Sequence, residues 1–254
     1  MKLLVDAGNS RLKWALWDGR ELRAAAHCPL KSDPGGAVRT LLAALPGAVD
    51  AAVIANVAGP WVADALRRGL ALHSALPPRF VSTSASACGV RCAYAEPARL
   101  GVDRWVATIA AFHLASGAAL VVDAGTAVTV DLVDAGGQHL GGLILASPEL
   151  MARALYRDTS DIGHAHTQSM PGAGAGAFGR STDEAVSFAA VLALAGAIDR
   201  AGAEAAAALG AAPPLFITGG GAPALLPYLS AEVRHRPHLM LEGLALFADD
   251  GSGA

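Results

Sequence analysis

Short apolar runs, which predict strands, alternate along the chain with longer segments whose apolar positions recur at helical spacing. Residues 3–6 and 12–17 predict two strands joined by a turn, and residues 51–57 predict a buried strand. Residues 61–70 and 100–114 carry apolar positions near the helical period. Because strands alternate with helices, we expect the α/β class.

The opening of the chain is repeated once in its second half. The sequence LVVDAGT at residues 120–126 parallels LLVDAGN at residues 3–9, and a second apolar run follows each copy. Such self-similarity indicates duplicated structural units. We therefore expect two similar domains, residues 1–116 and residues 117–254.

The second half continues with further strand and helix signals. A glycine-rich strand is expected around residues 141–144, and an alanine-rich helix is expected over residues 182–208. Residues 215–218 predict a strand that ends in a turn of three glycines, and residues 239–247 predict a last helix.

Composition and charge narrow the class of partner. Of the 254 residues, 53% are hydrophobic and 16% are charged, which is typical of a compact globular protein. The net charge is −3 and no stripe of basic residues occurs, so we expect neither a nucleic acid nor a membrane as partner. The first apolar run is interrupted too early for a signal peptide, so we expect a cytoplasmic protein with its three cysteines reduced.

The Asp6 turn offers groups that suit phosphate and magnesium. Asp6 ends the first predicted strand, and the backbone around Gly8 can approach a phosphate closely because glycine has no side chain. The Asp6 carboxylate suits a magnesium ion. This pattern also marks ordinary turns, but its second copy at Asp123 and the glycine turn at residues 218–221 favour a nucleotide cleft. The chain has no P-loop sequence.

Lys13 is the lysine placed to meet a phosphate. It lies seven residues after Asp6, on the strand that returns from the turn. Strand alternation directs it toward the same cleft, where its point charge would neutralise a terminal phosphate. A solvated strand lysine is the alternative, and the position within the motif favours the phosphate role.

Asp103 and Arg104 lie together at a predicted helix start. Asp103 is either a helix N-cap or a general base. Arg104 is either a surface cation or a clamp for a substrate carboxylate, which its planar fork suits. The residues alone leave both alternatives open.

Two histidine clusters and one loop do not match known site patterns. His164 with His166 and His235 with His238 lack accompanying cysteines or carboxylates, so we do not predict a zinc site. The glycine and alanine loop at residues 171–179 follows no predicted strand and contains no lysine. We interpret it as a linker or a dimer contact.

Taken as a set and in this order, five segments resemble type III pantothenate kinases over residues 1–247. They are residues 6–15, residues 94–104, residues 123–127, residues 179–182 and residues 218–220. The resemblance implies two actin-like (ribonuclease H-like) domains with an ATP cleft between them, and a homodimer. It also implies ATP-dependent phosphorylation of pantothenate to 4′-phosphopantothenate, the first step of coenzyme A synthesis.

The resemblance also implies a role for individual residues. Asp103 corresponds to the catalytic base and Asp123 to the ligand of a monovalent cation (K⁺ or NH₄⁺), while the magnesium ion bound with ATP is expected at Asp6 from the residues alone. The ATP contacts implied are Asp6, Ala7, Gly8, Asn9, Ser10, Arg11, Leu12, Lys13, Thr126, Gly219 and Gly220. The pantothenate contacts implied are Tyr94, Gly101, Val102, Asp103, Arg104 and Thr182.

The sequence departs from the family pattern at two places, and two other functions remain alternatives. Ser181 follows Arg180 where the family usually has a lysine–asparagine pair, and Ser147 begins a segment where proline–glycine is more frequent. The first alternative is a kinase of a sugar or another small hydroxy acid, because the fold hosts many substrates. The second is a non-catalytic nucleotide-binding regulator, which would need neither Asp103 nor Lys13.

Overall fold

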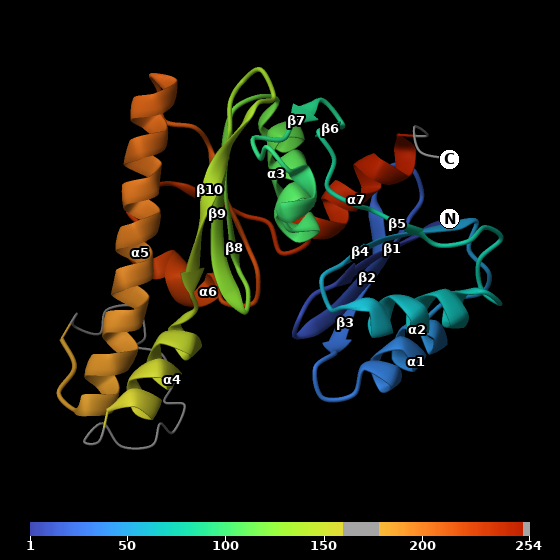
Figure 1. Cartoon of the computed structure of the whole chain (residues 1–254), viewed down its shortest axis with the longest axis horizontal. Helices are drawn as coiled ribbons and strands as arrows, with labels where there is room; N and C mark the ends of the chain where they lie inside the picture. The colour runs from blue at the N-terminus through green and yellow to red at the C-terminus, as the bar shows by residue number, and fades with distance from the viewer. Residues whose placement is uncertain (160–177, 251–254) are drawn as a thin grey trace. The chain divides into compact units, whose positions relative to one another are not determined.

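The computed structural model describes residues 1–159 and 178–250, and these form two compact units (Figure 1). Unit 1 contains residues 1–114, the short segment 136–139 and the C-terminal segment that begins at residue 238. Unit 2 contains residues 115–135 and 140–237. Each unit is built around its own five-stranded sheet.

The sheet of unit 1 has the strand order β3-β2-β1-β4-β5. A continuous run of buried residues forms the central strand β1, which pairs antiparallel with β2 and parallel with β4. Edge strand β3 is largely exposed, whereas β1 and β4 are buried, as expected for central strands covered on both faces. The strands span Lys2–Ala7 (β1), Arg11–Trp17 (β2), Leu22–Pro29 (β3), Ala51–Asn56 (β4) and Arg79–Phe80 (β5).

Helices α1 (Pro34–Ala43) and α2 (Pro60–Leu70) pack on one face of this sheet (Figure 1). Helix α1 begins where the Asp33 carboxylate accepts the Gly36 N–H at 2.8 Å, with proline at the first helical position. Both helices bury aliphatic side chains against alternate residues of β1. Helix α3 (Val102–Ala115), the turn η1 (Pro97–Arg99) and the hairpin of β6 (Ser86–Ala87) and β7 (Val90–Arg91) complete the unit together with the C-terminal helix.

The C-terminal helix α7 (Leu239–Asp249) belongs to unit 1, although the chain reaches it from unit 2. Its apolar residues pack against β1 and β4. Gly243 lets α3 approach closely, because a Cβ at this position would lie 2.6 Å from a methyl of Val106. The compact units therefore differ from the two continuous segments 1–116 and 117–254, and the assignment of those segments as domains stays a prediction.

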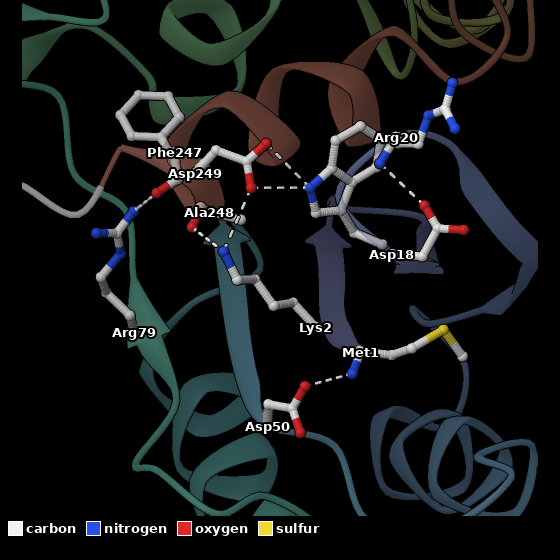
Figure 2. Close-up of polar contacts among 10 residues, drawn as sticks. Met1, Lys2, Asp18, Arg20, Asp50, Arg79, Phe247, Ala248 and Asp249 are labelled. Atoms are coloured by element: carbon white, nitrogen blue, oxygen red, sulfur yellow. Dashed lines mark hydrogen bonds and ion pairs between the residues drawn. The ribbon is translucent and has the colours of Figure 1, made fainter.

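Polar groups from three strands of unit 1 hold the C-terminal end of α7 (Figure 2). Lys2 Nζ lies 3.3 Å from the Asp249 carboxylate, and the Trp17 indole N–H donates to the same carboxylate at 3.0 Å. The Arg79 guanidinium donates to the carbonyl oxygen of Phe247. Two cations thus meet the end of a helix where unpaired carbonyls make the field negative, which stabilises α7 in this position.

The sheet of unit 2 repeats the arrangement of the first, in the order β10-β9-β8-β11-β12. Its central strand β8 pairs antiparallel with β9 and parallel with β11, as β1 does with β2 and β4. The predicted duplication is therefore confirmed at the level of sheet topology. The strands span Ala119–Ala124 (β8), Ala127–Val133 (β9), His139–Ala146 (β10), Leu215–Thr218 (β11) and Val233–His235 (β12).

Helix α5 (Thr182–Leu209) packs on this sheet through aliphatic residues, and α4 (Pro148–Asp158) packs on α5. The two serines that depart from the family pattern are helix caps. Ser147 accepts the Leu150 N–H in front of α4, and Ser181 accepts the Glu184 N–H in front of α5. The unit also contains α6 (Ala222–Leu225) and η2 (Leu226–Tyr228).

Among the described residues, α5 alone is long and apolar enough to cross a membrane by length and composition. Only 33% of its most apolar stretch is buried in the structure, and core helices of soluble proteins meet the same criteria. His164, His166 and residues 171–177 of the glycine and alanine loop lie outside the described residues. Within the described ranges, no group of three histidine, cysteine or acidic residues is arranged to hold a metal ion.

Candidate active site

The β1–β2 hairpin brings Asp6 and Lys13 together, as the sequence predicts. The two residues are direct partners in the antiparallel ladder, so their side chains share one face of the sheet. Lys13 Nζ lies 3.7 Å from the Asp6 carboxylate, and Asp6 is only 6% exposed. The Gly8 N–H donates to the Arg11 carbonyl at 3.1 Å and closes the turn. The hairpin thus places a cation beside a carboxylate at the end of a buried strand.

The other predicted ATP contacts of this hairpin fall into two groups. Asn9 and Ser10 are exposed at the tip of the turn, and Arg11 is exposed next to them. Ala7 and Leu12 pair with each other and have fully buried side chains in the core. A ligand at this turn can therefore contact Ala7 and Leu12 only through their backbone atoms.

Asp103 occupies the second position of helix α3, which begins at Val102. Its Oδ1 accepts the N–H of Arg104 at 2.8 Å, and Oδ2 has no hydrogen bond to any described residue. Gly101 provides the room for this carboxylate, because a Cβ there would lie 2.6 Å from Asp103 Oδ1. The N-cap alternative for Asp103 is wrong, since Asp103 is inside the helix. An acid in the first turn remains favourable because the helix N-terminus carries positive potential.

Arg104 is held against Tyr94 beneath the surface of unit 1. Arg104 is 6% exposed, and its Nη1 donates to the Tyr94 hydroxyl at 3.1 Å. Its Cζ lies 5.9 Å from the centroid of the Tyr94 ring, within the range of a cation–π contact. The surface-cation alternative for Arg104 is therefore wrong. The structure thus brings together two of the residues predicted to bind the substrate, Tyr94 and Arg104.

A pocket of about 420 Å³ opens beside Tyr94 and is lined by Tyr94, Ala95, Glu96 and Arg99. The last two form an exposed ion pair at 3.9 Å. Sequence reasoning included residues 94–97 in a family motif but gave no role to Glu96 or Arg99. No spacing signal in the sequence marks them: Glu96 lies just before η1 and Arg99 is its last residue, and only the structure shows that both line the pocket.

In unit 2, Asp123 is flanked by two threonines on neighbouring strands. Asp123 pairs with Thr129 on β9 and with Thr218 on β11, so the three side chains point to the same face of the sheet. Thr218 is 1% exposed, and its Oγ1 has no hydrogen-bond partner among the described residues. In the first copy of the hairpin, the residues paired with Asp6 are Lys13 and Ala55. The second carboxylate thus has hydroxyl groups where the first has a lysine and an alanine.

The predicted ATP contacts of unit 2 lie at the same end of β8. Gly219 has a φ of +92°, and a Cβ there would lie 2.5 Å from Asp123 Oδ1, so only glycine fits. The Gly221 N–H donates to the Ala124 carbonyl at 2.8 Å and fixes the turn on the strand. Gly220 and Thr126 are exposed, the latter in the β8–β9 turn.

Thr182, predicted to contact pantothenate, is the first residue of α5 in unit 2 and is exposed. The following acid, Asp183, accepts the Tyr156 hydroxyl at 3.3 Å, which ties the start of α5 to α4. The Arg180 N–H donates to the Glu184 carboxylate at 2.6 Å in front of the helix.

Comparison with solved structures shows the same fold in kinases and nucleotide-binding proteins. A ROK family glucokinase from Streptomyces griseus, in complex with glucose and AMPPNP, aligns with a TM-score of 0.55 at 12% identity, covering 98% of this chain and 99% of the other. An activator of 2-hydroxyisocaproyl-CoA dehydratase from Clostridium difficile, with bound ADPNP, aligns with a TM-score of 0.52 at 12% identity, covering 98% and 94%. These likenesses confirm the actin-like α/β fold.

Comparison of sequences identifies the family. The sequence model of type III pantothenate kinases matches residues 2–204. A type III pantothenate kinase from Aromatoleum aromaticum is 39% identical over 255 residues, covering 100% of both chains. One from Nitrosococcus oceani is 36% identical over 259 residues, covering 99% of this chain and 95% of its own. The chain belongs to the type III pantothenate kinase family.

Proposed function

We infer that this chain is an ATP-dependent kinase that phosphorylates pantothenate to 4′-phosphopantothenate in coenzyme A synthesis. The observation that carries the inference is family membership across nearly the whole chain. The Asp103, Arg104 and Tyr94 arrangement supports it, because it supplies a carboxylate base next to a buried anion-binding group.

Phosphoryl transfer needs mainly alignment and charge neutralisation from the protein. Asp103 is the base that takes the hydroxyl proton of pantothenate, and its Oδ2 is the oxygen that does so, because Oδ1 already accepts a backbone N–H. The same backbone bond fixes the rotation of the carboxylate. The base is therefore held in place before the substrate binds.

Arg104 and Tyr94 are the groups that hold pantothenate. The guanidinium is a planar fork of N–H donors whose geometry matches a carboxylate, so it suits the substrate carboxylate. Gly101, Val102 and Thr182 are proposed as further substrate contacts.

Lys13 and the β1–β2 turn are proposed to hold the phosphates of ATP. The carboxylate of Asp6 is a hard oxygen ligand at a strand end and fits a magnesium ion, which would neutralise charge on the phosphates when bound with ATP. Lys13 adds a second positive charge on the same face. Thr126, Gly219 and Gly220 are proposed as further ATP contacts.

A monovalent cation, K⁺ or NH₄⁺, is proposed at Asp123. The donor set fits: one carboxylate and two hydroxyl oxygens share one face, and the buried Thr218 Oγ1 lacks a partner that a cation would provide. The single negative charge of this set matches a monovalent ion better than a divalent one. Such an ion would add positive charge near Asp123.

We expect K⁺ and NH₄⁺ to stabilise and activate the enzyme more than Na⁺, and we expect Thr218→Val to reduce both effects. The substitution keeps the volume of the side chain but removes the hydroxyl that we assign to the ion. The measurements are the thermal midpoint and the rate in each salt at equal ionic strength. Thr40→Val, which removes a threonine hydroxyl on α1, is the control. Equal responses of Thr218→Val and wild type would remove this ligand assignment.

We propose a homodimer located in the cytoplasm, without nucleic acid or membrane as partner. Support for the dimer is the family resemblance and the alanine-rich helix α5, whose small side chains allow close helix approach and whose Leu192 is exposed. Light scattering at micromolar concentration should give twice the chain mass. A stable monomer would contradict the proposal.

One assay tests the function against its two alternatives. ADP release coupled to a second enzyme should depend on pantothenate and should exceed the rate with glucose or with other small hydroxy acids. Faster turnover of a sugar would favour the first alternative, a kinase of another substrate. ATP binding without any turnover would favour the second, a non-catalytic regulator.

A further inference from the structure

A fully buried histidine packs on the tyrosine of the candidate substrate site. His139, the first residue of β10, is 0% exposed and belongs to unit 1. Its ring centroid lies 6.2 Å from that of Tyr94, with 18° between the planes. This geometry is within the range of offset-stacked aromatic pairs. The ring of Tyr94 thus has an aromatic stacking partner that is itself fully buried.

The backbone that carries His139 is fixed independently of the imidazole. The Arg91 N–H donates to the Gly137 carbonyl at 2.8 Å, and Arg91 Nε donates to Gln138 Oε1 at 3.2 Å. Gly137 has a φ of +77°, and a Cβ there would collide with the Gly89 carbonyl, so the approach of the two segments depends on glycine. We therefore expect the segment to stay in place when the His139 side chain is replaced.

The imidazole also meets the segment that leads into Tyr94. The Ala93 N–H donates to His139 Nδ1 at 3.5 Å, which is a long and weak hydrogen bond. The imidazole ring itself stacks on the ring of Tyr94. At its other end, the Tyr94 hydroxyl accepts a hydrogen bond from Arg104 at 3.1 Å. The chain of contacts therefore runs from His139 through Tyr94 to Arg104.

We propose that His139 is a positioning residue for substrate binding. Its ring fixes the orientation of the Tyr94 ring, and the Tyr94 hydroxyl in turn fixes the Arg104 guanidinium toward the pantothenate carboxylate. The inference rests on the proposed function, and His139 itself does not touch the substrate. Because the residue acts on binding, its removal should raise KM for pantothenate more than it lowers kcat.

The test compares His139→Leu, which removes the ring, with His139→Phe, which keeps a ring but removes Nδ1. Stacked aromatic pairs contribute enough for about a 3- to 10-fold rise in KM for pantothenate in His139→Leu. We expect KM for ATP to stay within about twofold in both variants, and His139→Phe to restore KM for pantothenate to within about twofold of wild type. The control is His73→Leu, which replaces a half-buried histidine of unit 1 that bonds the Gly69 carbonyl, and it should leave KM for pantothenate unchanged.

A double-mutant cycle with Tyr94→Leu separates positioning from general stability. In the Tyr94→Leu background, His139→Leu should change KM for pantothenate by less than about twofold, because the ring it positions is gone. Any of three results would overturn the inference. These are an equal KM for pantothenate in His139→Leu and His139→Phe, parallel increases in KM for pantothenate and for ATP, and full additivity in the cycle. A wild-type protein without pantothenate-dependent ADP release would instead overturn the proposed function, and the inference with it.

Discussion

Asp103→Asn should lower kcat by about 10²–10⁴-fold, the usual contribution of a general base. Asparagine keeps the shape of the side chain, and its Oδ1 can still accept the Arg104 N–H. What it loses is the basic Oδ2, so no group remains there to take the hydroxyl proton. Steady-state kinetics should show that KM for pantothenate changes much less than kcat.

The control for this substitution is Asp64→Asn on α2. Asp64 is an exposed helical acid in unit 1 whose ion pair with Arg67 is 2.6 Å long. Exposed pairs of this kind contribute little to stability, so we expect kcat to stay near wild type. If Asp103→Asn also retained near-normal kcat, Asp103 would be a residue of the helix start only, and the base would have to be another group.

Lys13→Met should lower kcat by about 10²–10³-fold, as the loss of a charged donor at a transferring group usually does. Methionine retains most of the length and the apolar stem, but the ammonium group is lost. The Asp6 carboxylate, which lies 3.7 Å from Lys13 Nζ, would then face the phosphates without its cation. We expect KM for ATP to rise together with the fall in kcat, measured at saturating pantothenate.

Lys31→Met provides the matched control, because Lys31 is an exposed lysine of the same unit. It should leave both kinetic constants unchanged. Circular dichroism should show that both variants are folded. A Lys13→Met enzyme with the rate of the Lys31→Met control would show that Lys13 is a solvated strand lysine, the alternative left by the sequence.

The duplicated hairpin is the part of the fold that could be predicted with the most detail. The apolar runs place β1 and β2 within one residue of their bounds, and the repeated Asp-Ala-Gly sequence predicts the matching pair β8 and β9. The edge strand β3 and the helix α4 were not predicted, and β3 is mostly exposed while α4 buries no residue fully. Their positions depend on tertiary packing, which a local pattern does not encode.

The return of α7 to unit 1 could not be predicted from the chain order. A repeat implies two continuous halves, whereas the apolar face of α7 finds its partners on β1 and β4. Lys2, Trp17 and Arg79 then hold its end through contacts between residues more than 160 positions apart. Sequence spacing carries no signal for such long-range contacts.

The candidate site could be predicted where a sequence motif marks its residues. It could not be predicted where residues meet only in the folded structure. Asp6 and Lys13 meet because strand register follows from alternation, and Arg104 meets Tyr94 as the motif order implies. The threonines beside Asp123 come from two other strands. Only the register between the strands shows that their hydroxyls lie on the same face of the sheet as the Asp123 carboxylate. His139 lies 45 residues after Tyr94, and only the fold shows the stacking of their rings.

The most direct test of the central claim is identification of the product. The purified chain should be incubated with ATP, magnesium, K⁺ and an equimolar mixture of pantothenate, glucose and a small hydroxy acid, and the phosphorylated species measured by mass spectrometry. We predict that 4′-phosphopantothenate is the dominant product and that Asp103→Asn, treated identically, forms almost none. Dominant phosphorylation of glucose or of the hydroxy acid, or ATP consumption with no phosphorylated acceptor, would contradict the account.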